Sequence, residues 1–180
     1  MWWHDAAKLL SSHGLMLKSY ALRGSMMRGP ACVAYTSTGH ECRTDLPLAA
    51  GGTNRAAQPV ELLLAALLGC KTATAHYVAR HLWPRPHHRI DALCFSDIVA
   101  HRDERGALAL PIAERPPVPA ALVSVRGVAT VTPRSSGVIS AADVRALGAI
   151  VEERCPVADT LVRAGCVIDI EWRLGLAEAS

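Results

Sequence analysis

The longest apolar run of the chain lies near its centre, where the sequence between Glu61 and Lys71 reads LLLAALLGC. Pro59 suits the first turn of a helix, and no further proline occurs until Pro84. The pattern therefore predicts one long helix that begins at Pro59 and ends before Pro84. Because its first half is apolar on every side, we expect this helix to be buried all round, either between layers or against a partner chain.

Alternation of apolar and polar residues predicts strands on both sides of this helix. The segments ACVAYT (31–36) and HECRTDLP (40–47) form a predicted hairpin across a turn that contains Gly39. The segments IDALCFSDIVAHR (90–102) and ALALPI (107–112) form a second predicted hairpin.

The remainder of the chain is predicted to contain two strands and two helices. A strand is expected over 121–133, with one buried side. That side carries Val123, Val125, Ala129 and Val131. Ser140 and Asp143 have the spacing of a helix N-terminal cap. Pro156 ends the helix that they begin and starts a short second one, after which CVIDIEWRL (166–174) is the clearest strand of all.

This order of elements favours an α+β domain with separate sheets over a repeated βαβ pattern. A chain of 180 residues is one ordinary domain, which we place at residues 26–180 after an N-terminal extension at 1–25. The extension lacks the continuous apolar stretch of a secretory signal, so we expect a cytoplasmic protein with reduced thiols. The alternative is a transit peptide for a mitochondrion or another organelle, because the segment is poor in acidic residues.

Composition and charge exclude several classes of protein. The formal net charge of +3 is too small a positive excess for a nucleic-acid-binding protein. The central apolar run is about half of the ~20 residues that a membrane-spanning helix needs, so no membrane segment is expected. A chain of this length also buries enough surface to be stable without a disulfide framework or a structural metal.

The six cysteines are the main candidates for chemistry, and none of them has the spacing of a zinc site. Cys32, Cys94 and Cys166 lie in strand patterns, where we expect buried and inert thiols. Cys70 lies within the apolar helix and needs a nearby cation or hydrogen-bond donor to become reactive. Cys155 directly precedes the short helix, whose first amide groups favour a thiolate, so it could be reactive without further help.

Two segments resemble the motifs of the OsmC/Ohr family, the osmotically inducible and organic-hydroperoxide-resistance proteins. GGTNRAAQPVELLLAALLGC (51–70) is similar to the family's glycine-containing loop, proline and central helix with the first active-site cysteine. VEERCPVADTLV (151–162) is similar to the segment around the second cysteine. The resemblance extends from about Met26 to Leu174. It implies an OsmC-like α+β fold, in which two β-sheets wrap around long central helices in an intertwined homodimer with active sites between the subunits.

The resemblance also implies a reaction. As in the peroxidases of the family, Cys70 would attack an organic hydroperoxide as the peroxidatic cysteine and become a sulfenic acid. Cys155 would resolve this acid to a disulfide, which an external dithiol would reduce. The reaction needs no metal and no organic cofactor, and His76 and His81 lack the i, i+4 spacing of helical metal ligands.

The chain departs from these peroxidases at the groups that support the reactive thiolate. In the peroxidases a Glu follows the proline and pairs with an Arg, whereas this chain has Val60 at that position and Glu61 next. Nine helical positions turn through about 900°, so Glu61 and Cys70 point to opposite faces. Arg28 is the nearby candidate for the Arg, and Glu153 is a further candidate that could reach a site across a dimer.

Two functions stay open on these residues. The intact cysteine pair favours a thiol-dependent peroxidase that acts in defence against oxidative stress. Val60 favours a non-enzymatic OsmC-like protein that binds an apolar small molecule or senses redox state at the dimer interface. The remaining charged residues are expected to be solvated, including Lys71, which points about 100° away from Cys70 on the helix.

Overall fold

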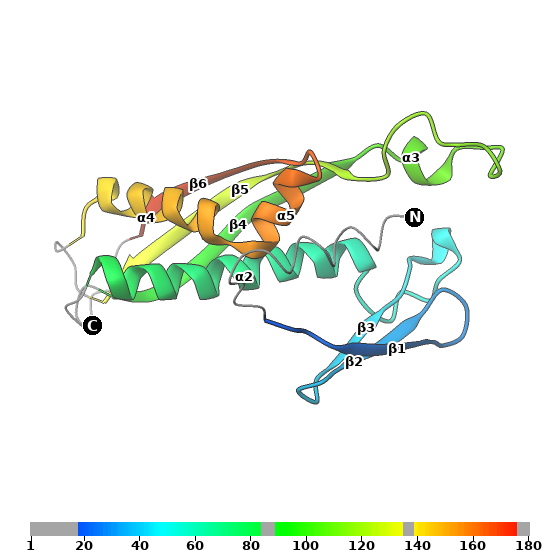
Figure 1. The fold of residues 1–180 in the computed structure, drawn as a ribbon, viewed down its shortest axis with the longest axis horizontal. Coiled ribbons are helices and arrows are strands. Elements are labelled where there is room, and N and C mark those ends of the chain that lie inside the picture. The colour runs from blue at the N-terminus through cyan, green and yellow to red at the C-terminus, as the bar shows by residue number, and fades with distance from the viewer. Residues whose placement is uncertain (1–17, 84–88, 135–138, 176–180) are drawn as a thin grey trace, which may run out of the picture. The chain divides into compact units, whose positions relative to one another are not determined.

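The structure is a computed structural model that describes residues 18–83, 89–134 and 139–175 (Figure 1). Most of the expected N-terminal extension, residues 1–17, lies outside the described residues. The chain divides into two compact units, Met1–Leu62 and Leu63–Ser180, which we call the N-terminal unit and the C-terminal unit. Each unit is built around a three-stranded sheet, so the fold is α+β with separate sheets, as the sequence predicts.

The sheet of the N-terminal unit is antiparallel, in the order β1-β2-β3. Its strands are β1 (Leu22–Met26), β2 (Cys32–Thr36) and β3 (Glu41–Thr44). The predicted hairpin of β2 and β3 is confirmed, and Gly39 adopts the positive φ of 89° that its turn requires. The sequence pattern does not predict β1, because the segment LRGSM has no apolar alternation and is exposed throughout. The first four residues of β1 belong to the expected extension.

The loop that leads into the long helix is organised around the buried carboxylate of Asp45. This carboxylate accepts hydrogen bonds from the amides of Leu46, Thr53 and Arg55, at 2.8–3.1 Å, and from the Thr53 hydroxyl at 2.6 Å. The Thr53 hydroxyl is the largest cause that lowers the pKa of Asp45 to about 2. Gly52 is required by the close approach of the chain, since a Cβ there would lie 1.9 Å from the carbonyl oxygen of Leu46.

We expect Asp45→Asn to be less stable than the natural chain near pH 7, and this difference to shrink as the pH falls. The folded-state pKa of Asp45 is about 2, below the unfolded value near 3.9, so its ionised form stabilises the fold above about pH 4 and this contribution disappears towards pH 2. Thermal unfolding between pH 7 and pH 2 measures the difference, with Asp169→Asn on exposed surface as the control. A difference that stays constant over this range contradicts the assignment.

The sheet of the C-terminal unit has the order β4-β5-β6, with β4 antiparallel to β5 and β5 parallel to β6. Its strands are β4 (Ile90–Arg102), β5 (Leu122–Pro133) and β6 (Val167–Leu174). The parallel pair is possible because two helices connect β5 to β6. These are α4 (Ala141–Arg154) and α5 (Pro156–Arg163), and both pack against β6 (Figure 1).

Local end signals place the helices where the sequence predicts them. The long helix α2 (Pro59–Leu82) has Pro59 at its first position. At the start of α4, Asp143 and Ser140 form a reciprocal capping box, in which the Asp143 amide donates to the Ser140 hydroxyl and the Ser140 amide donates to the Asp143 carboxylate. Pro156 separates α4 from α5, as predicted.

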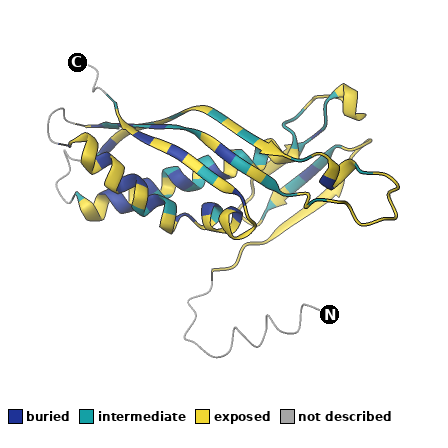
Figure 2. Ribbon diagram, turned by 90° about the horizontal axis from the view of Figure 1, so that it is seen from above, coloured by how far each residue is buried: buried dark blue, intermediate teal, exposed yellow. Residues whose placement is uncertain are grey.

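The core of the C-terminal unit joins the inward-facing residues of its sheet with one face of each of the three helices. Figure 2 shows the strands banded by alternating buried and exposed residues. The fully buried members of this core are Leu67, Ala75, Val125, Ala129, Val131, Val144, Leu147, Val151 and Cys155. The predicted buried side of β5 is therefore confirmed except at Val123, which is 53% exposed.

One prediction about this unit is wrong. The segment 107–112 forms no second strand, because β4 pairs with β5 instead and the chain between them contains only the short helix α3 (Arg105–Leu108). A single chain buries α2 on one side only: one face lies in the core, whereas Leu63 and Tyr77 on another face are 39% and 52% exposed, so burial all round stays a prediction that depends on a partner chain. The apolar character of that second face has no explanation within the described part of a single chain.

By length and composition, α2 is also apolar enough to cross a membrane. This criterion alone is weak evidence, because the central helix of a protein core satisfies it equally. Here α2 carries a fully buried lysine, Lys71, whose partner Glu152 lies on α4. We therefore interpret α2 as the central helix of the C-terminal unit.

Candidate active site around Cys70 and Cys155

The C-terminal unit brings Cys70 and Cys155 together, although 85 positions separate them along the chain. Cys155 lies at the junction of α4 and α5, where it is completely buried in the core. Cys70 lies on α2, is half-buried and packs against the same core. Neither thiol forms a disulfide in the structure.

The environment of Cys155 raises the pKa of its thiol. Burial is the largest cause, and the adjacent Cys70 side chain acts in the same direction. Two groups oppose them, the amide of Ala158 at the start of α5 and the positive charge of Lys71. The Ala158 amide lowers the pKa of Cys155, as expected for an amide at a helix start, although the Cys155 side chain forms no capping hydrogen bond with α5. The raised pKa disfavours the thiolate that the sequence suggests at Cys155, because burial outweighs the helix amides.

A partly buried ion pair, with the Lys71 side chain fully buried and that of Glu152 32% exposed, lies beside the two cysteines. The Nζ atom of Lys71 bonds the Oε2 atom of Glu152, and the Oε1 atom of Glu152 accepts a hydrogen bond of 3.2 Å from the indole N–H of Trp172. Lys71 has no exposed surface, so the expectation of a solvated charge there is wrong. The reason is that the face of α2 at 100° from Cys70 is the face that meets α4.

Close packing of α4 on β6 sets the position of Glu152. Gly148 faces the ring of Trp172, and a Cβ on this glycine would lie 2.4 Å from Cγ of the indole. Only glycine therefore lets α4 approach the strand closely enough for Trp172 to reach Glu152. The sequence pattern does not single out Glu152 or Trp172 as site residues. The one feature that points to Glu152 is its position about one helical turn before Cys155.

The structure describes the local surroundings of the supporting residues that the sequence suggests. Glu153 is exposed on α4 and forms no ion pair or hydrogen bond with the described residues. Glu61 belongs to the N-terminal unit, where its carboxylate accepts a hydrogen bond of 2.8 Å from the amide of Gln58 and so caps the start of α2. Arg28, in the same unit, is exposed and lines a cavity of about 430 Å³ together with Arg43 and Arg55. Support of Cys70 by these residues stays a prediction.

The other cysteines occupy different environments. Cys166 is buried as expected, and burial raises the pKa of its thiol. Cys32 is half-buried, whereas Cys42 and Cys94 are exposed. The expectation of a buried thiol at Cys94 is wrong because the neighbouring residues on β4, Leu93 and Phe95, are the ones that pack against the core. Among the described residues, no three histidine, cysteine or acidic side chains gather as metal ligands would.

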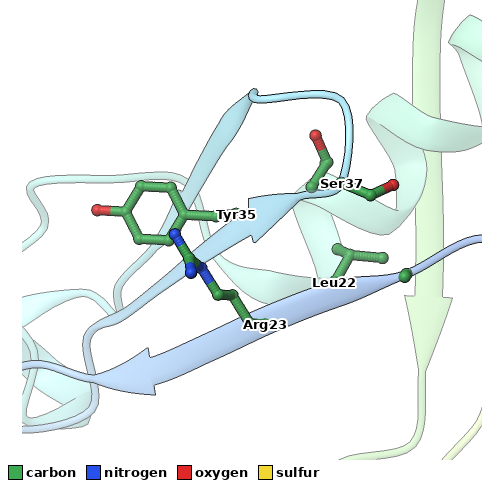
Figure 3. Close-up of a pocket in the computed structure, with 6 residues that line it drawn as sticks. Leu22, Arg23, Tyr35 and Ser37 are labelled. Atoms are coloured by element: carbon green, nitrogen blue, oxygen red, sulfur yellow. The ribbon is translucent and has the colours of Figure 1, made fainter.

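One hollow of the N-terminal unit carries no comparable chemistry. It has a volume of about 400 Å³ and lies against β1 and β2. Figure 3 shows the Arg23 side chain beside the ring of Tyr35, with the guanidinium carbon 5.6 Å from the ring centroid, and Leu22 and Ser37 close by. No cysteine, histidine or carboxylate lines this hollow. The cysteine pair of the C-terminal unit is therefore the candidate active site.

The chain is similar to known proteins over the region that contains both cysteines. The family model for OsmC-like protein matches residues 52–171, which include both cysteines. No curated protein matches the chain significantly.

Solved structures share the fold at low sequence identity. An OsmC-like protein from Mycoplasma pneumoniae is 18% identical with a TM-score of 0.65, covering 91% of this chain and 100% of that one. An organic hydroperoxide resistance protein OsmC from Legionella pneumophila is 16% identical with a TM-score of 0.62, covering 89% and 99%. An organic hydroperoxide resistance protein from Elizabethkingia anophelis is 13% identical with a TM-score of 0.61, covering 90% and 99%. With two-thirds of its residues matched by the family model and the fold shared, the chain belongs to the family of OsmC-like proteins.

Proposed function

We propose that this protein is a thiol-dependent peroxidase that reduces organic hydroperoxides through Cys70 and Cys155. One observation carries the proposal: the structure holds two free thiols from distant parts of the chain side by side, one half-buried and one fully buried. The organic hydroperoxide resistance proteins of the same fold support the choice of substrate class.

The reaction follows from the chemistry of two adjacent thiols. The thiolate of Cys70 attacks the terminal oxygen of the hydroperoxide and the O–O bond breaks. Cys70 becomes a sulfenic acid, and the alkoxide that leaves takes up a proton to become an alcohol. The thiolate of Cys155 then attacks the Cys70 sulfur, forms the disulfide and releases hydroxide, which leaves as water after taking up a proton. An external dithiol reduces the disulfide and restores both thiols.

We also propose a homodimer, because α2 has an apolar face that the described part of one chain leaves open. At 100° per residue, Leu63, Ala66, Ala73 and Tyr77 lie within an arc of about 80°. All four are exposed, and Cys70 lies within the same arc. A second copy that covers this face would therefore also close the active site around Cys70 and exclude water from it.

This proposal predicts that a charge on the open face of α2 disrupts the dimer. Light scattering on the natural chain should give about twice the 19.2 kDa of one chain, and Tyr77→Glu should give the single mass because the new carboxylate would be buried without a partner. Arg145→Glu, on the exposed surface of α4, is the control and should stay dimeric. A natural chain that is monomeric at micromolar concentration contradicts the proposal.

A second candidate function rests on Val60, which stands where the peroxidases of the family have a Glu and is 38% exposed. In that case the protein binds an apolar small molecule or senses redox state, and turnover is absent. A hollow of about 330 Å³ between α2 and α4, lined by Tyr77, Leu82 and Ile150 among others, is of a size suited to such a ligand.

Consumption of an organic hydroperoxide in the presence of a dithiol separates the two functions. We expect the peroxidase to consume many equivalents of cumene hydroperoxide per chain with dithiothreitol as the reductant. With the same dithiol present, a redox sensor consumes only about one equivalent per chain because its disulfide is not reduced fast enough for turnover, and a binding protein consumes none. Absence of turnover with several dithiols overturns the peroxidase.

A further inference from the structure

Lys71 is the only described charged residue of the C-terminal unit that is fully buried. Lysine is rarely buried unless it is paired, because transferring an ammonium group out of water is costly. This lysine directly follows Cys70 in the sequence and extends into the layer between α2 and α4. Its position therefore calls for an explanation beyond filling space.

The contacts of Lys71 hold its charge next to Cys155. Its Nζ atom is bound by the carboxylate of Glu152, which lies three residues before Cys155 on α4. The indole N–H of Trp172 donates a hydrogen bond of 3.2 Å to the other carboxylate oxygen and so fixes the orientation of Glu152. Lys71 is therefore held by a residue about one helical turn before Cys155, and its positive charge acts on the Cys155 thiol.

Other titratable groups around Cys155 do not supply a positive charge. From α2 it meets the thiol of Cys70, and α4 contributes the carboxylate of Glu152. On α5 the nearest charged residue is Asp159, which is exposed and paired with Arg163 at 2.8 Å. Cys166, just before β6, adds a buried neutral thiol to the same core. Arg154 directly precedes Cys155 but is exposed, so Lys71 is the buried cation among the described residues of the C-terminal unit that acts on the Cys155 thiol.

We propose that Lys71 is a positioning residue for the resolving step, in which its positive charge favours the thiolate of Cys155 as that sulfur attacks Cys70. The inference rests on the proposed peroxidase chemistry, and it gives Lys71 a role at Cys155 that is separate from the support of Cys70 by an Arg and a Glu. The Lys71 charge lowers the pKa of Cys155 against the effect of burial, which agrees with this role.

An ion pair with a purely structural role would be easier to replace. Exchanging a buried pair for apolar residues of similar size is often neutral for stability or even favourable. A stability measurement alone therefore cannot identify the role of Lys71, and the experiment must report on the thiolate of Cys155.

The attack of Cys155 on a mixed disulfide at Cys70 gives such a report without any hydroperoxide. In a background with Cys32, Cys42 and Cys94 replaced by serine, Ellman's reagent first modifies the half-buried Cys70. Cys155 then displaces the bound thionitrobenzoate, which is followed by its absorbance. The rate of this second phase depends on the fraction of Cys155 present as thiolate. Cys155→Ser, which lacks the second phase, identifies it.

We expect Lys71→Gln to move the pH profile of the second phase upward by about one unit, which corresponds to about tenfold slower displacement near pH 7. The sign follows because loss of a nearby cation disfavours the thiolate, so a higher pH is needed to form it. Lys71→Arg keeps the charge and should keep the profile of the natural chain. The double variant Lys71→Met/Glu152→Gln removes both charges without leaving either one unpaired, and it should shift the profile in the same direction.

Circular dichroism establishes which variants fold. The proposal is overturned by an unchanged profile in Lys71→Gln, or in the double variant should the single one not fold. A shift in Lys71→Arg as large as that in Lys71→Gln also overturns it, since charge would then not be the cause. A protein that consumes no hydroperoxide but shows the expected profiles refutes the peroxidase and leaves the role of Lys71 intact.

Discussion

Cys70→Ser is expected to lower the rate of organic hydroperoxide consumption by more than about 10³-fold, because removing the nucleophile of a covalent mechanism abolishes its first step. Serine is nearly isosteric with cysteine, and the site is only half-buried, so the fold should be retained. The measurement is the initial rate of cumene hydroperoxide loss with excess dithiothreitol, alongside the natural chain at the same concentration.

Cys94→Ser is the matched control for this variant. Cys94 is a free and exposed thiol on β4, and its loss should leave the rate within about twofold of the natural chain, as surface substitutions usually do. Equal loss of rate in both variants would point to general thiol reactivity rather than to a site. Full activity in Cys70→Ser would exclude Cys70 as the peroxidatic residue.

Cys155→Ser has the second largest expected effect, and this effect differs in kind. Cys70 should still react with the hydroperoxide, but its sulfenic acid has no partner and accumulates. Labelling with dimedone should therefore rise from a trace in the natural chain to most of the protein. Excess hydroperoxide should then convert Cys70 to the sulfinic acid, which dithiols do not reduce, so turnover stops.

The stability of Cys155→Ser needs a separate check, because the new hydroxyl is fully buried in an apolar core. We expect it to destabilise the fold by about 1–3 kcal/mol, which circular dichroism and thermal unfolding would detect. Cys166→Ser, at the other buried cysteine, is the control for this cost and should not trap the sulfenic acid. Dimedone labelling that is equally strong in Cys166→Ser contradicts the role of Cys155.

Local signals in the sequence predict most of the secondary structure correctly. Pro59 and Pro156 at helix starts, the Ser140 capping box and the alternation in β6 are all confirmed. Each of these signals acts within a few residues of the chain. They can therefore be identified without knowledge of tertiary contacts.

The wrong predictions concern contacts between distant segments. The partner of β4 is β5, and their pairing begins with Arg102 opposite Leu122. The segment between these two residues is mostly irregular, and the turn at 103–106 does not predict the pairing. The burial of Lys71 depends on Glu152, 81 positions later, and on the packing of Trp172 that Gly148 permits. Helical geometry places Lys71 on a different face from Cys70 correctly, but it does not show which face meets α4.

The candidate site was predicted in part. Cys70 and Cys155 were identified from the resemblance to the OsmC/Ohr family, and the structure brings them together. Periodicity alone does not pair them, since any of the six cysteines could pack against another in a folded chain. The charged groups around the pair, Lys71 and Glu152, became visible only with the tertiary structure.

The most direct measurement for the proposed mechanism is peptide mapping by mass spectrometry after one equivalent of cumene hydroperoxide is added to the reduced chain. The mechanism predicts that peptides containing Cys70 and Cys155 become joined by a disulfide, while the exposed Cys42 and Cys94 remain thiols. Recovery of Cys70 and Cys155 both as free thiols, with the hydroperoxide unchanged, would contradict it.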